Sequence, residues 1–164
     1  KARGRIVNMG SISGRMAAPL LGPYAASKYA MEAITDSLRR ELRPWGMWVA
    51  IIEPGVVTTP IWDKSSEAGR QLASTLPAEG HALYGKMLHA MGAMVKRMVP
   101  HGVPPAHVAK AVYHALTSSR PKTRYLVGPD ARIQTRLLGF VPDRLADVLI
   151  ARAMGLSAQE PRGE

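Results

Sequence analysis

Cysteine is absent from the 164-residue sequence, which excludes disulfide bonds, thiolate metal ligands and a catalytic thiol. Phenylalanine occurs once, and no basic stretch alternates with aromatic side chains on which nucleic-acid bases stack. No apolar run reaches the roughly 20 residues that a membrane-spanning helix needs. Taken together, these absences favour a globular domain. The lack of cysteine fits a reducing compartment, and we expect a cytoplasmic location.

Basic residues outnumber acidic ones, giving a formal net charge of +10, while the hydrophobic content of 46% is ordinary for a globular chain. An excess of this kind indicates either an anionic partner, such as a nucleotide cofactor, nucleic acid or a membrane surface, or a solvated basic surface. Because no basic stretch alternates with stacking aromatics, we favour the solvated surface and expect no nucleic-acid partner.

Apolar runs and Gly/Pro punctuation predict an alternation of strands and helices. Strands are expected at 5–9, 48–52 and 124–127, and helices at 24–42 and 106–117, with one or two more helices within 61–99. A strand, helix, strand order predicts a parallel βαβ unit with a right-handed crossover. The loops 10–22 and 54–60 would then meet at the carboxyl edge of the sheet, where α/β proteins bind ligands.

Small side chains recur at helical spacing along 24–42, namely Ala26, Ala30, Ala33 and Ser37. Such a face allows close packing against a sheet or against a second helix.

Tyr24 and Lys28 are four residues apart on this helix and therefore share a face. A free phenol titrates near ~10 and is a poor acid or base at neutral pH, but a neighbouring ammonium favours the phenolate. The pair can therefore exchange a proton with an alcohol or carbonyl oxygen. Taken alone, the same spacing is also typical of an ordinary surface pair.

Ser11 lies thirteen residues before Tyr24, in the loop after the first strand. Its hydroxyl can hold a substrate oxygen beside the phenol, or it can bond the backbone of its own turn. Ser13 competes for the role, and the spacing favours Ser11.

Three segments in register resemble the short-chain dehydrogenase/reductase family: Gly4 to Gly14, the Tyr24 to Lys28 motif, and Pro54 to Thr59. The resemblance implies an α/β fold, the C-terminal part of a Rossmann-like parallel sheet flanked by helices. It also implies an NAD- or NADP-dependent oxidoreductase that interconverts an alcohol and a carbonyl. The segment 125–131 and the basic stretch after it are similar to the hydroxysteroid and retinol dehydrogenase branch, which suggests a lipophilic substrate.

Site roles follow from the same resemblance. It implies that Tyr24 is the general acid/base, that Lys28 assists it and bonds the nicotinamide ribose, and that Ser11 orients the substrate oxygen. Further cofactor contacts are implied for Pro54, Gly55, Val57 and Thr59. Thr59 can instead serve as a helix N-cap ahead of Pro60.

The chain departs from the family pattern because the Gly-rich phosphate turn and the residue that selects NAD or NADP are not in it. We therefore expect a fragment that begins mid-fold and is inactive alone. The expected organisation is the C-terminal half of an NAD(P)-binding domain at 1–130, with substrate-loop helices at about 61–99, an amphipathic helical extension at 131–156 and a disordered tail at 157–164.

Other functions stay open at this stage. A non-catalytic scaffold with the same fold and a basic peripheral membrane or interaction module driven by residues 131–154 are the alternatives. The expected partners are a small-molecule alcohol or ketone and further copies of the chain, in a homodimer or homotetramer formed through the helix 24–42; membrane association is less favoured. Of the five histidines, His107 and His114 are two helical turns apart, and no carboxylate lies at ligand spacing beside them, so no metal site is expected.

Overall fold

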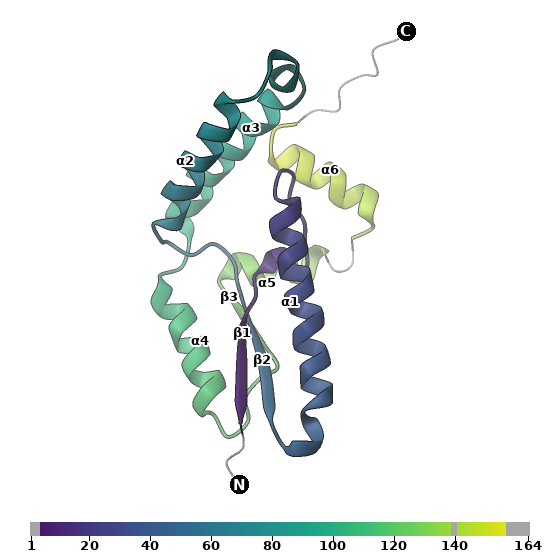
Figure 1. Cartoon of the computed structure of the whole chain (residues 1–164), viewed down its shortest axis with the longest axis vertical. Helices are drawn as coiled ribbons and strands as arrows, with labels where there is room; N and C mark the ends of the chain where they lie inside the picture. Colours follow the sequence, from purple (N-terminus) through teal and green to yellow (C-terminus); the bar gives the residue numbers. More distant parts are fainter. Residues whose placement is uncertain (1–3, 139–140, 157–164) are drawn as a thin grey trace.

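The computed structural model describes residues 4–138 and 141–156, so the expected disordered tail lies outside the described residues. Three strands form one sheet: β1 (Arg5–Met9), β2 (Trp48–Pro54) and β3 (Arg124–Val127). The strands are parallel and follow the order β1-β2-β3. A parallel sheet flanked by helices confirms the α/β prediction (Figure 1).

The central strand β2 is buried because both of its faces are covered, as its continuous apolar run predicts. Ile51 and Ile52 are completely buried. The strand extends two residues further than its apolar run, because Glu53 and Pro54 pair with Leu126 and Val127 of β3. This extension carries a carboxylate into the interior.

Helices α1 (Gly22–Glu41) and α4 (Pro105–Thr117) cover opposite faces of the sheet (Figure 1). Both begin with a proline in the first turn, where the missing N–H costs no hydrogen bond. Arg39 and Arg40 lie in the last turn of α1, where their positive charges interact favourably with the negative end of the helix dipole. The core lies between α4 and the sheet, where Ala115 packs against Ala50 and Ile52.

The small-residue face of α1 does not pack on the sheet. The buried residues of this helix are Ala25 and Thr35, whereas Ala26, Ala30, Ala33 and Ser37 are exposed. Of the two partners considered for this face, the sheet was therefore the wrong one. Packing against a second helix stays a prediction.

An arm of two helices, α2 (Ile61–Ser74) and α3 (Ala78–Met98), stands beyond the carboxyl ends of the strands (Figure 1). Arg97 in α3 donates to the carbonyl of Ala153 at 3.1 Å and so joins the arm to α6 (Asp143–Ala153). The remaining elements are short: the 3-10 turns η1 (Ile12–Gly14), η2 (Arg43–Trp45) and η3 (Val99–His101), and the helix α5 (Pro129–Leu138). No helix among the described residues is long and apolar enough to cross a bilayer.

Candidate functional site

Ser11 lies at the carboxyl end of β1, at the edge of the sheet where ligands bind in α/β proteins. The Gly10 N–H donates to the Ile52 carbonyl at 2.8 Å, which continues the pairing of β1 with β2 up to the serine. Ser11 itself is buried, with 8% of its surface exposed. The strand pairing therefore determines the position of this side chain.

The Ser11 hydroxyl accepts a hydrogen bond from the Ser13 N–H at 3.1 Å and caps η1. The turn role considered for this serine is thus present. It does not exclude the other role, because a hydroxyl that accepts one hydrogen bond keeps its own hydrogen to donate.

Tyr24 and Lys28 lie side by side on the first two turns of α1. The Lys28 Nζ is 5.7 Å from the centroid of the Tyr24 ring. The same ammonium donates to the Met9 carbonyl at 3.0 Å, two residues before Ser11. Tyr24 is 46% exposed. The structure therefore brings Tyr24 and Lys28 together and ties Lys28 to the strand that leads into Ser11.

The segment from Pro54 to Thr59 begins at the last residue of β2, at the same edge of the sheet. The Gly55 N–H donates to the Val127 carbonyl at 2.9 Å, and the Val56 N–H donates to Asp130 Oδ2 at 2.7 Å. A Cβ at Gly55 would come within 2.1 Å of that carboxylate. Glycine is thus required here so that the loop can lie against Asp130.

Val57 and Thr59 offer polar groups to a ligand. The Val57 carbonyl accepts from the Trp62 indole N–H at 2.7 Å, whereas no partner for the Val57 N–H is found among the described residues. Helix α2 has Pro60 as its N-cap, so the capping role considered for Thr59 is not observed. A backbone donor and a threonine hydroxyl suit a carboxamide, which needs both a donor and an acceptor.

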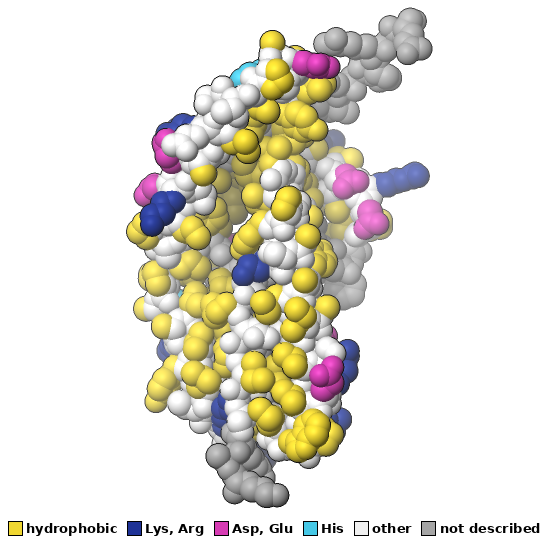
Figure 2. All heavy atoms as spheres, in the orientation of Figure 1, with side chains coloured by type: hydrophobic (Ala, Val, Ile, Leu, Met, Phe, Trp, Pro, Cys, Tyr) yellow, Lys and Arg dark blue, Asp and Glu magenta, His cyan; other side chains and the backbone are white. Residues whose placement is uncertain are grey.

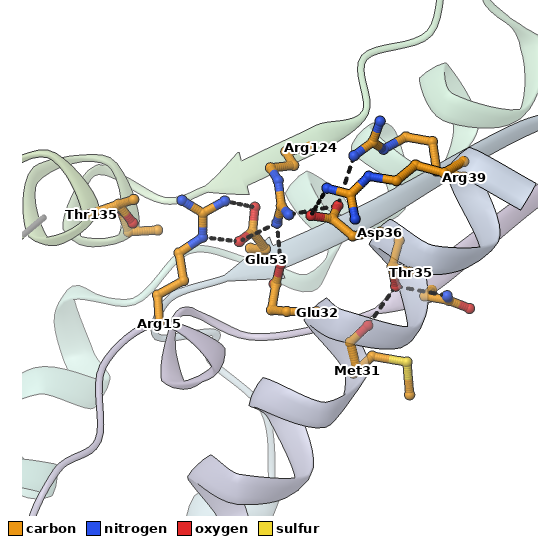
Figure 3. A network of polar contacts seen from close by, with 12 residues as sticks. Arg15, Met31, Glu32, Thr35, Asp36, Arg39, Glu53, Arg124 and Thr135 are labelled. Atoms are coloured by element: carbon orange, nitrogen blue, oxygen red, sulfur yellow. Dashed lines mark hydrogen bonds and ion pairs between the residues drawn. The ribbon is translucent and has the colours of Figure 1, made fainter.

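Two features of the site were not predicted from the sequence. Asp130 holds the loop through Val56 from 74 residues away. Glu53 lies among Arg15, Arg124 and Glu32 (Figure 3), which are 38, 71 and 21 residues away from it in the sequence. No local spacing signals contacts of this range; the only hint was a carboxylate at the end of an apolar strand.

Burial raises the pKa of Glu53 to about 7, assisted by the neighbouring Glu32 and opposed by Arg15. Although burial alone would raise it, the pKa of Asp36 is lowered by Arg39, Arg124 and Arg40. The pKa of Arg124 is raised by Glu32, Asp36 and Glu53, against the effect of its own burial.

A cavity of about 550 Å³ borders this charge cluster, and Arg15, Glu32 and Arg124 are among its lining residues. Its lining includes none of Ser11, Tyr24 and Lys28. Among the described residues, no group of three His, Asp or Glu side chains gathers in a way that could hold a metal ion.

The family model described as short chain dehydrogenase matches residues 1–70. The chain is 39% identical over 164 residues to 17-beta-hydroxysteroid dehydrogenase type 6 of Bos taurus, covering 97% of this chain and 51% of that protein. It is 35% identical over 164 residues to retinol dehydrogenase 5 of Mus musculus, with the same coverage. The chain belongs to the short-chain dehydrogenase/reductase family. Its relatives place it in the hydroxysteroid and retinol dehydrogenase branch, and it spans about half the length of these two relatives.

The fold agrees with this membership. A short-chain dehydrogenase/reductase from Burkholderia phymatum, solved in complex with NAD, superposes with a TM-score of 0.61 at 24% identity. The superposition covers 99% of this chain and 53% of that one. The likeness extends to the fold, and the roles of Ser11, Tyr24 and Lys28 stay predictions.

Proposed function

We propose that the complete protein is an NAD- or NADP-dependent oxidoreductase that interconverts an alcohol and a carbonyl. The observation that carries this proposal is the grouping of Tyr24, Lys28 and the strand end before Ser11. Related proteins named as dehydrogenases of hydroxysteroids and retinol support the reaction class.

The residues present suit a nicotinamide nucleotide. The Lys28 ammonium donates one hydrogen bond to the Met9 carbonyl and has two further hydrogens for ribose hydroxyls. The Val57 N–H, for which the described residues supply no acceptor, and the Thr59 hydroxyl suit the carboxamide, while Pro54 and Gly55 offer a backbone surface for the ring. When bound, the nicotinamide would supply or accept the hydride.

The protein's own groups handle the proton and the oxygen. Tyr24 gives its phenolic proton to the carbonyl oxygen in reduction and takes the hydroxyl proton in oxidation. Ser11 donates a hydrogen bond to that oxygen and holds it in place. The Lys28 ammonium beside the ring stabilises the phenolate that forms when Tyr24 has given its proton.

A lipophilic substrate is part of the proposal. Helix α3 carries Met87, Met91, Met94 and Met98, which share one face and are all half-buried. Hydrophobic side chains gather over α3 and the start of α1, on either side of a recess in the surface (Figure 2). Methionine lines such surfaces well because its flexible side chain adapts to irregular apolar ligands.

We also propose a role for each segment of the chain. Residues 1–130 would supply the second half of the nucleotide-binding domain, 61–99 the substrate-covering helices, and 131–156 the helical extension. A homodimer or homotetramer through the exposed small-residue face of α1 would complete the assembly.

The test is to mix the complete protein with a retinoid or steroid alcohol and NAD or NADP and to follow formation of the reduced nicotinamide. The reverse reaction with deuterated reduced cofactor should place deuterium on the alcohol carbon. Cofactor binding without turnover of any alcohol or ketone would contradict the enzyme and favour a scaffold. A preference for small polar alcohols would contradict the lipophilic substrate alone.

A further inference from the structure

Glu53 is a completely buried carboxylate immediately before Pro54 and Gly55. Arg15 Nε lies 2.5 Å from its Oε1, and an Arg15 Nη lies 3.5 Å from its Oε2. Arg124 approaches the same Oε1 at 3.6 Å. A buried carboxylate gripped by a guanidinium fork is held in a defined orientation, since both of its oxygens are engaged.

Arg15 belongs to the turn that starts at Ser11. The Gly14 N–H donates to the Ser11 carbonyl, and the Arg15 N–H donates to the Ile12 carbonyl, both at 2.9 Å. Gly14 lies so close to α1 that a Cβ there would come within 2.8 Å of the Lys28 carbonyl. The turn that joins Ser11 to Arg15 is therefore compact and lies directly against α1.

Arg124 extends the contact to α1. Its guanidinium bonds Glu32, one turn after Lys28, and lies 2.8 Å from Asp36 one turn further (Figure 3). The cluster thus joins the turn of Ser11, the helix of Tyr24 and Lys28, and the strand that ends at Pro54.

We propose that Glu53 is a positioning residue, which through Arg15 and Arg124 fixes Ser11 and α1 relative to the Pro54–Gly55 loop. This inference rests on the proposed function, because these are the parts that would hold the substrate oxygen and the nicotinamide. Their separation determines whether hydride and proton reach the same carbonyl group, and small displacements between reacting groups slow such reactions strongly.

The first test replaces the carboxylate by an amide of the same shape. In the complete protein, Glu53→Gln should lower kcat about a hundredfold, the scale of an ångström displacement, while cofactor affinity changes far less. Glu41→Gln is the matched control, since Glu41 is exposed in the last turn of α1, where it accepts a hydrogen bond from the Ser37 hydroxyl at 2.6 Å. A Glu53→Gln protein with a lower melting temperature but unchanged kcat would overturn the proposal and leave Glu53 a stabilising residue.

The second test is chemical rescue. The cavity of about 550 Å³ reaches Arg15, whose side chain is 33% exposed. Arg15→Ala should lose most of its kcat and recover part of it when methylguanidinium is added, whereas sodium chloride of equal ionic strength should have no effect. Equal responses to the two salts would contradict a specific role for the guanidinium.

The third test is the pH profile. The charged groups around Glu53 are Arg15 of the turn, Glu32 of α1 and Arg124 of β3. Asp36 of α1 lies 2.8 Å from Arg124. Because the pKa of Glu53 is raised to about 7, its charge is lost as the pH falls through neutrality. The wild-type kcat should therefore fall along an acid limb near pH 7 that Glu53→Gln lacks. An identical limb in both proteins would contradict the proposal.

Amide hydrogen exchange separates this proposal from the proposed function. If Glu53 couples the two loops, Glu53→Gln should speed exchange in 10–22 and 54–60 together, with or without any activity. A wild-type protein that turns over no alcohol would overturn the proposed function, and the exchange result would still decide the coupling. Unchanged exchange in both loops would overturn the coupling even in an active enzyme.

Discussion

The ammonium group of Lys28 lies close to both Met9 and Tyr24. It bonds the Met9 carbonyl at 3.0 Å and lies 5.7 Å from the centre of the Tyr24 ring. An ammonium has three hydrogens and carries its charge at a point, so it can hold a carbonyl, bond a ligand and favour a nearby phenolate at once. A hydrocarbon of similar length would retain the packing and lose all three.

Lys28→Met should therefore weaken cofactor binding and lower kcat in the complete protein. Losing a charged hydrogen bond of about 1.5–3 kcal/mol predicts a decrease of about tenfold to a hundredfold in kcat/KM. Lys110→Met on α4, where the lysine is exposed on the other side of the sheet, is the control. If neither binding nor rate changes, Lys28 has neither of these roles.

At the scale of elements, a buried chain of hydrogen bonds locks α1 onto β1. Asn8 Nδ2 donates to Thr35 Oγ1 at 2.8 Å, and the Thr35 hydroxyl donates to the Met31 carbonyl at 2.6 Å. Thr35 is 1% exposed, so water cannot replace either bond. The chain fixes the helix of Tyr24 against the strand that leads to Ser11.

Thr35→Val keeps the shape of the side chain but leaves the Asn8 amide without its acceptor. We expect a loss of about 1–3 kcal/mol in the free energy of unfolding. Thr117→Val is the matched control, because the exposed Thr117 hydroxyl makes the same bond, to the Tyr113 carbonyl, at the end of α4. Chemical denaturation of the two variants measures the difference, and equal stability would contradict a locking role for Thr35.

The elements themselves followed from the sequence because their signals are local. Pro23 at the start of α1 and the apolar runs of the strands predicted boundaries to within two residues. The buried face of α1 was not predictable in this way, since Glu32 and Asp36 point to Arg124 only after the sheet has formed. Tyr24 and Lys28 were found because one helical turn joins them; Asp130 and the partners of Glu53 were not, because only the tertiary fold does.

Across the whole molecule, one charge cluster connects the turn of Ser11, helix α1 and strands β2 and β3. Its buried member, Glu53, has its pKa raised from 4.5 in the unfolded chain to about 7. Between these values the folded state binds more protons than the unfolded state, so the contribution of Glu53 to stability is lost as the pH rises through 7. Burial therefore opposes the negative charge on Glu53, the charge that the proposed positioning role requires.

This sign predicts how Glu53→Gln changes stability with pH. The difference in unfolding free energy, wild type minus Glu53→Gln, should be larger at pH 5 than at pH 8. Urea denaturation of both complete proteins at the two pH values measures it, with Glu41→Gln as the surface control. A difference that grows with pH would mean that the pKa of Glu53 is lowered rather than raised.

The central claim is that the phenol of Tyr24 exchanges the proton of the substrate oxygen. The most direct measurement is the turnover of Tyr24→Phe against Tyr29→Phe in the complete protein. Both tyrosines are 46% exposed on α1, and each change removes a single hydroxyl. We predict that Tyr24→Phe folds normally but loses about a hundredfold or more in kcat while Tyr29→Phe stays active; a Tyr24→Phe enzyme with more than about a tenth of wild-type turnover would contradict the account.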